Sequence, residues 1–490
     1  MFDYERELLF DEIHGLVPDA VVKKISPDLV EVSSALTSEQ ALKKLTRLVY
    51  AESIFSDKEA LKTIQAQKES SCLTSGKTNR QSTRYGAHGL HDYKGKFNPQ
   101  VVASLMNIFQ ADTDTRIIDP FCGSGTTLLE SNYHGVESFG FDLNPLACFV
   151  SNTKASSVEI CPNKIRESFK FVLSSLKPIP ISETTDREIY LSKWFLQGYL
   201  KTFEALKFSI EALRCEEVKN VFKLLVSDIL RDYSEQEPTD LRIRRRKSPY
   251  PSLTILEAFE NAVNNFIYNL DQIRKVLRPV NKATAVNVDI RDDELSNNFN
   301  HYFDLALTSP PYATALPYID TQRLSLVWLE LVEPKNISKL ERELIGSRDI
   351  TKRSITKLRD QLSFEKRLPE ELTLLCTKMV DSLNSSDGFR RQATPFVIYR
   401  YFLNMKEMFL NMSRVLKKNG HFALVVGTNS TTLGGIKFEL DTPRYLQLIA
   451  ENDNWEVVEN RELQTYHRYG LHSKNASKGE SLLILKNVID

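Results

Sequence analysis

A short apolar run that ends at two consecutive prolines constrains the fold of this chain more than any other feature. Residues 303–312 read FDLALTSPPY, and the uninterrupted run 305–307 is typical of a parallel strand that is buried on both faces. Neither proline can donate a ladder hydrogen bond, and Pro310 is biased towards extended backbone by the proline that follows it. The run therefore predicts a strand whose carboxyl end carries a rigid corner, followed by the aromatic ring of Tyr312.

Such a corner lies where open α/β sheets bind their ligands, outside the carboxyl ends of the strands. It offers a hydroxyl, backbone carbonyls and a ring, which suit a flat, hydrogen-bonding ligand such as a nucleobase. An ordinary strand-terminating turn has the same pattern. The corner alone leaves both interpretations open.

A glycine-rich turn far upstream narrows the choice. Residues 119–127 read DPFCGSGTT between a predicted strand and a predicted helix, and Gly123 and Gly125 allow close approach of backbone amides to a ligand. The turn lacks the Gly-Lys-Ser/Thr of a phosphate loop and the third glycine of a dinucleotide site. Of the ligands that such a turn binds, an adenosyl compound with an amino-acid end remains as the best candidate. Asp142, at the end of the next predicted strand, is placed to accept hydrogen bonds from ribose hydroxyls.

The order of these patterns predicts one interrupted sheet domain. Its parts are residues 81–154, 281–334 and 393–490, and a C-terminal strand pair would complete seven strands with an antiparallel edge. Residues 155–280 read as a helical insertion that is a candidate target-recognition region, and 335–392 as a charged helical insertion or lid. Residues 1–80 read as a helical N-terminal extension.

Composition limits the partners and the compartment. The chain of 490 residues has zero net charge, so nucleic acid must be met by local patches. The basic cluster Arg242, Arg244, Arg245, Arg246 and Lys247 is one candidate for phosphate contact, with a solvated loop as the alternative. Six scattered cysteines without a CxxC pair argue against a metal site and fit a reducing cytoplasm. No apolar run reaches membrane-spanning length, so we expect a cytoplasmic protein without membrane contact.

The motifs DPFCGSGTT, FDLNP and TSPPY, with HDYKGKFNPQ upstream, together resemble the DNA amino-methyltransferases that use S-adenosylmethionine, especially the N4-cytosine branch. The resemblance covers roughly residues 88–150 and 283–486. It implies a Rossmann-like α/β fold, a seven-stranded methyltransferase sheet with large helical insertions. It also implies double-stranded DNA as substrate and a restriction–modification or phage-defence setting with a cognate restriction endonuclease.

The resemblance implies two sets of site residues. The cofactor set is Lys96, Phe97, Asp119, Phe121, Gly123, Gly125, Asp142, Asp289 and Thr308. The catalytic set, which would hold the target base, is Ser309, Pro310, Pro311 and Tyr312. Asp142 would bind the ribose and Asp289 would approach the adenine, with Asp292 and Asp293 as competitors for that second role.

The chemistry of an exocyclic amine explains the corner. Its lone pair is delocalised into the ring, and accepting its hydrogens directs that lone pair at a methyl donor. The hydroxyl of Ser309 and the carbonyl of Pro310 can accept them while Tyr312 stacks on the extruded base, which offsets part of the cost of extrusion. Methylation of a ring carbon would need a thiolate, but Cys122 lies in the cofactor turn and reads as a packing residue.

The identity of the base rests on one position. Ser309 resembles the cytosine pattern, whereas related adenine enzymes usually have Asp or Asn there. We therefore expect transfer to N4 of cytosine. N6-adenine methylation is the main alternative, and an RNA amino-methyltransferase or an inactive nucleic-acid-binding fold are the others.

Overall fold

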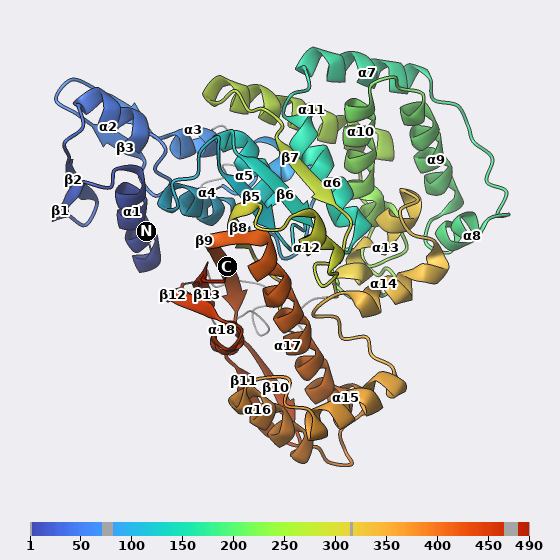
Figure 1. Ribbon diagram of the computed structural model, residues 1–490. Coiled ribbons are helices and arrows are strands. Elements are labelled where there is room, and N and C mark those ends of the chain that lie inside the picture. The colour runs from blue at the N-terminus through green and yellow to red at the C-terminus, as the bar shows by residue number, and fades with distance from the viewer. Residues whose placement is uncertain (1, 71–81, 314–316, 465–478, 490) are drawn as a thin grey trace.

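Apolar runs build the central sheet of this protein. In the computed structural model, which describes residues 2–70, 82–313, 317–464 and 479–489, they form seven strands of one mixed sheet in the order β12-β13-β9-β8-β5-β6-β7 (Figure 1). β13 runs antiparallel between β9 and β12, and the other neighbours are parallel. The expected seven-stranded α/β sheet with an antiparallel edge is therefore confirmed. The strands are Arg116–Asp119 (β5), Glu137–Phe141 (β6), Ala283–Val286 (β7), Phe303–Thr308 (β8), Leu416–Gly427 (β9), Trp455–Leu463 (β12) and Glu480–Asn487 (β13).

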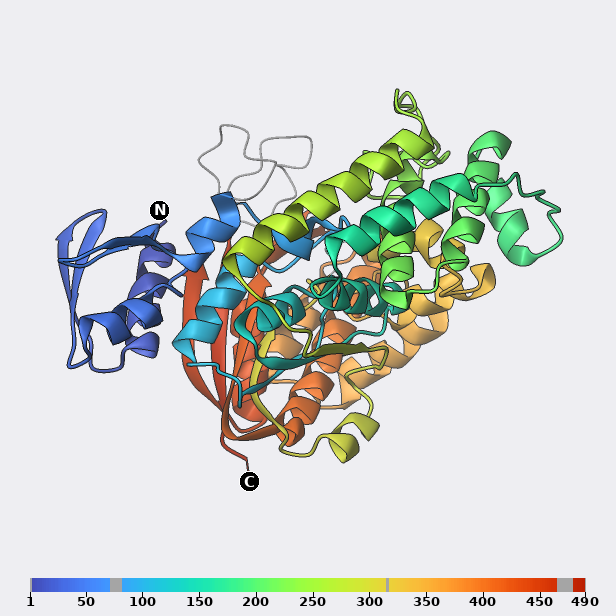
Figure 2. The same ribbon diagram turned by 90° about the horizontal axis from the view of Figure 1, so that it is seen from above.

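Successive side chains of β8 lie on opposite faces of the sheet. Leu305 and Leu307 pack with the helices α1 (Asp3–Leu16) and α4 (Pro99–Ile108). Ala306 packs instead with α17 (Phe389–Val415) and α18 (Thr442–Asn452). Figure 2 shows the C-terminal strands in red between the blue N-terminal elements and the orange helices. β8 is thus buried on both faces, as its apolar run predicts.

The first helical insertion has its own core. Phe203, Phe222, Phe259 and Trp328 are fully buried within one apolar cluster that joins the insertion to the helix after β8. This cluster is distinct from the two that cover the sheet. The helices that contribute to this cluster include α5 (Thr126–His134), α6 (Pro145–Ser157) and α13 (Tyr318–Trp328) of the sheet domain, and α7 (Pro162–Ser174), α8 (Asp186–Ser192), α9 (Gln197–Glu211), α10 (Glu216–Ile229) and α11 (Ile255–Val276) of the insertion.

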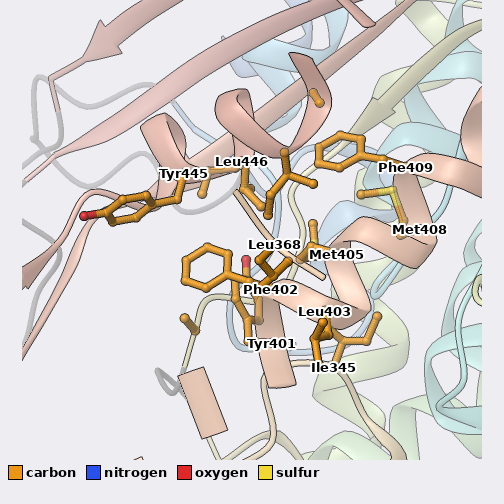
Figure 3. Close-up of a cluster of buried hydrophobic side chains, with 14 of the residues drawn as sticks. Ile345, Leu368, Tyr401, Phe402, Leu403, Met405, Met408, Phe409, Tyr445 and Leu446 are labelled. Carbon is orange, nitrogen blue, oxygen red and sulfur yellow. The ribbon is translucent and has the colours of Figure 1, made fainter. Parts of the chain in front are cut away.

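The second insertion packs on α17. Apolar side chains of α15 (Lys352–Phe364) and α16 (Glu370–Asp381), including Leu358, Leu372 and Met379, share a cluster with that helix. Figure 3 shows how Phe402, Met405 and other α17 side chains meet Leu446 of α18. The remaining elements here are α12 (Glu294–Asn298), α14 (Ile337–Glu343), α15 (Lys352–Phe364), α16 (Glu370–Asp381) and the hairpin β10 (Asn429–Leu433) and β11 (Ile436–Leu440).

The N-terminal extension differs from its expected helical character. It contains two short hairpins besides helices. Residues 71–80, the last part of the predicted extension, lie outside the described part of the chain. Its elements after α1 are β1 (Val21–Ser26), β2 (Leu29–Ser33), α2 (Ser38–Leu45), β3 (Ser53–Phe55), β4 (Ala60–Lys62) and α3 (Ile64–Ser70). Of the helices in the described ranges, none has the length and apolarity needed to cross a membrane.

Candidate active site

Asp119, at the end of β5, ties together the turn and the corner that the sequence singles out. Its buried carboxylate accepts hydrogen bonds from Oγ1 of Thr127 and Oγ1 of Thr308, both at 2.6 Å, and from the amide of Phe121 at 3.1 Å. Burial raises the pKa of this carboxyl to about 6. Asp119 and Thr308 therefore hold the ends of two adjacent strands in fixed positions.

The two predicted glycines have different surroundings. Gly125 begins α5 with a φ of +75°, and a Cβ added to it would lie 2.8 Å from Cβ and Oγ of Ser151. Gly123 has a φ of +49°, and its amide donates a 3.0 Å hydrogen bond to Oδ2 of Asp142. Gly125 is thus required by packing, whereas Gly123 presents its backbone to the space above the strands.

That space is a hollow at the carboxyl ends of β5, β6, β7 and β8, where an open α/β sheet binds its ligand. Of the predicted site residues, six line it: Phe121, Gly123, Asp142, Asp289, Ser309 and Pro311. The other lining residues are Tyr93, Gly95, Pro120, Leu143, Asn144, Val288, Ile290, Arg291, Tyr318, Leu344 and Ile345. The glycine turn and the proline corner thus face one shared site.

Asp142 lies on the wall of this hollow at the end of β6. Besides the bond from Gly123, its Oδ1 accepts one from the amide of Asn144 at 2.8 Å. Burial raises the pKa of its carboxyl to about 6, and the nearby charge of Asp119 adds to this rise. A buried carboxylate held at this strand end can accept hydrogen bonds from ligand hydroxyls.

Asp289 also lines the hollow, but its carboxylate holds a side chain of the protein. Arg291 approaches it with Nε at 2.8 Å and Nη2 at 2.5 Å, and the same Nη2 donates to the carbonyl of Glu343 at 2.7 Å. Its competitor Asp293 instead pairs with Arg414 at 2.9 Å. The geometry thus favours Asp289 over Asp293 as the residue facing the site.

The corner is anchored from two other strands. Oγ of Ser309 donates a 3.1 Å hydrogen bond to the carbonyl of Val425 on β9. The phenol of Tyr312 donates to Oε1 of Glu480, the first residue of β13, at 2.7 Å. Burial raises the pKa of Tyr312 well above its usual value, and the charge of Glu480 adds to this effect. The tyrosine is therefore a protonated donor.

Lys96 and Phe97 belong to the predicted cofactor set, but neither lines the hollow. Nζ of Lys96 donates to the carbonyls of Thr83 at 2.8 Å and His88 at 3.4 Å, and Phe97 packs in the cluster under α4. Tyr93 and Gly95 of the same segment line the hollow in their place.

Two tyrosines that are not in the predicted site sets also lie at the hollow. The ring of Tyr93 lies 3.5 Å from the position of a Cβ built on Gly123. Tyr318 lines the hollow at the start of α13, and the amide of Tyr312 hydrogen-bonds its phenol. Tyr93 lies within a motif that carries the resemblance, which is the signal that could have identified it.

The predicted basic cluster is largely used by the protein itself. Arg246 donates to the carbonyls of Ser234 and Asp232 at 2.6 and 2.7 Å, and Arg245 donates to the carbonyl of Lys193 at 2.8 Å. Arg244 pairs with Asp240 at 2.8 Å. Arg242 and Lys247 are exposed. Across the ranges that the structure covers, no group of three or more His, Cys, Asp or Glu side chains is arranged for a metal ion.

Comparisons with known proteins find similarity to methyltransferases. A family model described as UPF0020, RMKL-like, methyltransferase domain, matches residues 90–167, which contain the glycine turn and Asp142. The type II methyltransferase M.MvaI of Kocuria varians is 23% identical over 381 residues, which are 73% of this chain and 80% of that protein. M.BsoBI of Geobacillus stearothermophilus is 23% identical over 392 residues, 71% of this chain and 76% of that one. M.MjaII of Methanocaldococcus jannaschii is 30% identical over 131 residues, 27% and 24% of the two chains. The chain is a methyltransferase related to the type II methyltransferases.

Proposed function

We propose that this protein transfers a methyl group from S-adenosylmethionine to the exocyclic N4 amine of cytosine in duplex DNA. The observation that carries the proposal is the single hollow onto which both Asp142 and Ser309 open. The relatives bear the name type II methyltransferase, which supports DNA as substrate and a restriction–modification setting with a cognate endonuclease.

The lining of the hollow fits S-adenosylmethionine. Asp142 offers a carboxylate for ribose hydroxyls, and the turn at Gly123 leaves room for close approach. Val288 and Ile290 give an apolar wall for an adenine ring, beside the polar Asp289. When bound, S-adenosylmethionine supplies a methyl group on a positively charged sulfur.

The corner is arranged to accept the hydrogens of an amine. Because the hydroxyl hydrogen of Ser309 is donated to the carbonyl of Val425, the lone pairs of its oxygen stay available as acceptors. With the Pro310 carbonyl, Ser309 can hold both amine hydrogens and direct the nitrogen lone pair at the methyl group. Transfer would form the nitrogen–methyl bond as the sulfur–methyl bond breaks, with the electron pair of the broken bond left on the sulfur. The methylated amine would then lose one proton to solvent.

Within the described residues no cysteine lines the hollow, so the ring-carbon route lacks a thiolate there. Cys122 is buried against Ser151 and Gly140, as a packing residue would be. The choice of cytosine over adenine rests on Ser309 at the first position of the corner.

The direct test incubates the purified protein with unmethylated DNA and labelled cofactor, followed by mass spectrometry of the nucleosides. We expect N4-methylcytosine. Ser309→Ala combined with Tyr312→Ala should abolish transfer while the affinity for S-adenosylhomocysteine stays nearly unchanged, because neither side chain belongs to the proposed cofactor set. Ser338→Ala, at an exposed serine of α14, serves as the control.

Each alternative has its own outcome. N6-methyladenine alone would assign the enzyme to the adenine branch, and product found only on RNA would replace the substrate. Cofactor binding without transfer to either nucleic acid would indicate an inactive fold. Full activity in the double variant would show that the corner is not the catalytic site.

A further inference from the structure

The second insertion carries a helix whose exposed face is basic. α15 reads KRSITKLRDQLSF, with four basic residues and one acidic residue, Asp360. Its apolar side chains pack in the cluster around α17, whereas the side chains of Lys352, Arg353 and Lys357 are exposed. Residues four positions apart are neighbours on a helix surface, so Arg353 and Lys357 lie side by side, and Lys352 precedes them in the first turn. We refer to these three residues as the basic face of α15.

The side chains of the basic face form no ion pair or hydrogen bond with any residue that the structure describes. The basic loop of the first insertion differs in this respect, because Arg246 donates to the carbonyls of Ser234 and Asp232 at 2.6 and 2.7 Å. An anion bound by Arg246 would compete with these carbonyls. An anion bound by the basic face of α15 would displace no partner among the described residues.

The charges of the basic face do not stabilise the helix that carries them. Arg353 and Lys357 are a like-charged pair four positions apart, and such pairs are destabilising. Lys352 and Arg353 lie in the first turn, which contains no acidic residue, although the helix dipole favours negative charge there. Negative charge supplied by a bound polyanion would offset this repulsion.

The helix α17, on which α15 packs, projects beyond the corner. Val415, its last residue, leads into Leu416, which pairs with Phe303 at the amino end of β8. α17 has 27 residues and is about 40 Å long, whereas the six residues of β8 span about 20 Å. Because α17 ends at the edge of the sheet where β8 begins and packs on that sheet, its amino-terminal part extends past the carboxyl end of β8.

The loop between α14 and α15 connects this projecting part to the corner. A Cβ built on Gly346 would lie 2.9 Å from the carbonyl oxygen of Tyr312, so the loop backbone touches the corner. Arg400 of α17 donates to the carbonyl of Ser347 at 2.6 Å and holds the same loop. Lys352 follows Gly346 by six positions and therefore lies within about 20 Å of the corner.

α15 packs against the projecting part of α17. The guanidinium of Arg359 lies over the ring of Phe396, 5.3 Å from its centroid, and Phe396 precedes Arg400 by about one helical turn. Figure 1 shows α15 beside the lower end of α17, apart from α7, α9 and α10 of the first insertion in the upper part of the view. α15 thus lies beyond the edge of the sheet at which the hollow opens.

We propose that the basic face of α15 binds the phosphate backbone of duplex DNA beside the target base. The proposal rests on the proposed function and refines it, because it assigns backbone contact to the second insertion rather than to the basic loop of the first. Three cations without partners among the described residues complement the regular negative charge of the DNA backbone. A base extruded into the corner would bring the flanking backbone near α15, since the chain between Gly346 and Lys352 is short.

The test measures the affinity of the full chain for a short mixed-sequence DNA duplex by fluorescence anisotropy at several salt concentrations. Each lost phosphate contact lowers the slope of log affinity against log salt by about 0.9, so K352A/R353A/K357A should lose about 2.7 units of slope. Alanine is a good helix former, so this variant should fold, and unchanged affinity for S-adenosylhomocysteine checks that it does. The variant K352R/R353K/K357R keeps the three charges and should keep most of the slope.

A charge-matched control lies in the N-terminal extension, on the left of Figure 1 and away from α15. Lys23, Lys24 and Lys58 are exposed there, and K23A/K24A/K58A should keep the wild-type slope. A wild-type slope in the alanine triple variant of α15, or an equal loss in the control, would overturn the proposal. Loss of slope with an RNA duplex of the same sequence but not with DNA would overturn DNA as the partner. Loss of slope in a protein that methylates no DNA would instead uphold the basic face and overturn the proposed function.

Discussion

The phenol of Tyr312 donates a 2.7 Å hydrogen bond to Oε1 of Glu480, although the two residues are 168 positions apart in the chain. Tyr312 ends the corner after β8, and Glu480 begins the antiparallel strand β13. The bond ties the ring to a strand that lies two places away in the same sheet. Since burial and the charge of Glu480 raise the pKa of the tyrosine, the phenol stays protonated and continues to donate.

Loss of this acceptor should impair positioning more than binding. Glu480→Ala frees the ring of Tyr312, and misplacement by about 1 Å can cost about 100-fold in rate, so we expect kcat to fall by up to that factor. Glu480→Gln keeps an acceptor and should stay within about threefold of the wild type. Single-turnover kinetics with separate cofactor titration checks this. Glu462→Ala, exposed on the neighbouring strand, is the control, and an equal loss there would argue against a specific role.

Cofactor affinity should depend on pH through Asp142. Its pKa of about 6 means that the carboxylate is present above that pH and is protonated below it. Since ribose hydroxyls need acceptors, affinity for S-adenosylhomocysteine should be level above about pH 7 and fall by up to about tenfold per pH unit below 6. Asp119 has a pKa in the same range, so a variant at Asp142 is needed to tell which of the two carboxyls causes the pH dependence. Asp142→Asn should bind more weakly at pH 8 and show a flat profile by calorimetry; a persistent slope would assign the effect to another group.

Local chemistry was enough to predict the sheet and the two facing motifs. The run in β8 is apolar because both faces are buried, and the glycine turn has positive φ at Gly123 and Gly125, which favours glycine at both positions. The hairpin of β10 and β11, which was not predicted, has an equally local signal in Gly434 and Gly435, whose φ values are +54° and +84°.

Other assignments depended on contacts that no local pattern contains. Gly95 has a φ of +72° and lies in a turn; Tyr93 before it lines the hollow, whereas Phe97 after it packs in the core. Likewise, Arg245 and Arg246 read as free charges until the fold supplies the carbonyls of Lys193 and Ser234 as acceptors. Charge runs predict an interface only when their partners within the protein are known.

Glu130 should be a strong determinant of stability. This fully buried carboxylate of α5 accepts from Nζ of Lys68 at 2.9 Å, the phenol of Tyr85 at 2.6 Å and Nε2 of His88 at 2.7 Å. Burial alone would raise its pKa, but Lys68 and His88 hold the pKa well below the usual range. Glu130→Ala removes the carboxylate that pairs with the buried ammonium of Lys68 and should cost about 3–5 kcal/mol of unfolding free energy.

Urea denaturation followed by circular dichroism measures this loss. The control is Glu137→Ala, which removes a half-exposed partner of Arg116 at 3.2 Å and should cost about 1 kcal/mol or less. Equal losses in the two variants would show that the buried network contributes no more than a surface ion pair.

Glu12 should make stability fall as pH rises. Its Oε2 accepts from the amide of Val49 at 2.9 Å and from Nδ2 of Asn107 at 2.8 Å, and burial raises its pKa from 4.5 to about 7. Between these two values the folded chain binds more protons than the unfolded chain, so the unfolding free energy decreases with increasing pH. Above pH 7 the full penalty applies, about 3 kcal/mol for a shift of this size.

Glu12→Gln is neutral at every pH and keeps one acceptor, so it mimics the protonated form. We expect the variant to be more stable than the wild type by up to about 3 kcal/mol at pH 8 and to match it within about 1 kcal/mol at pH 4. Glu39→Gln, at an exposed position in α2, should show no such dependence on pH. Urea titrations at both pH values measure these differences in unfolding free energy. A variant that is less stable than the wild type at pH 8 would contradict the prediction. It would mean that the bonds to Val49 and Asn107 stabilise the carboxylate of Glu12 despite its burial.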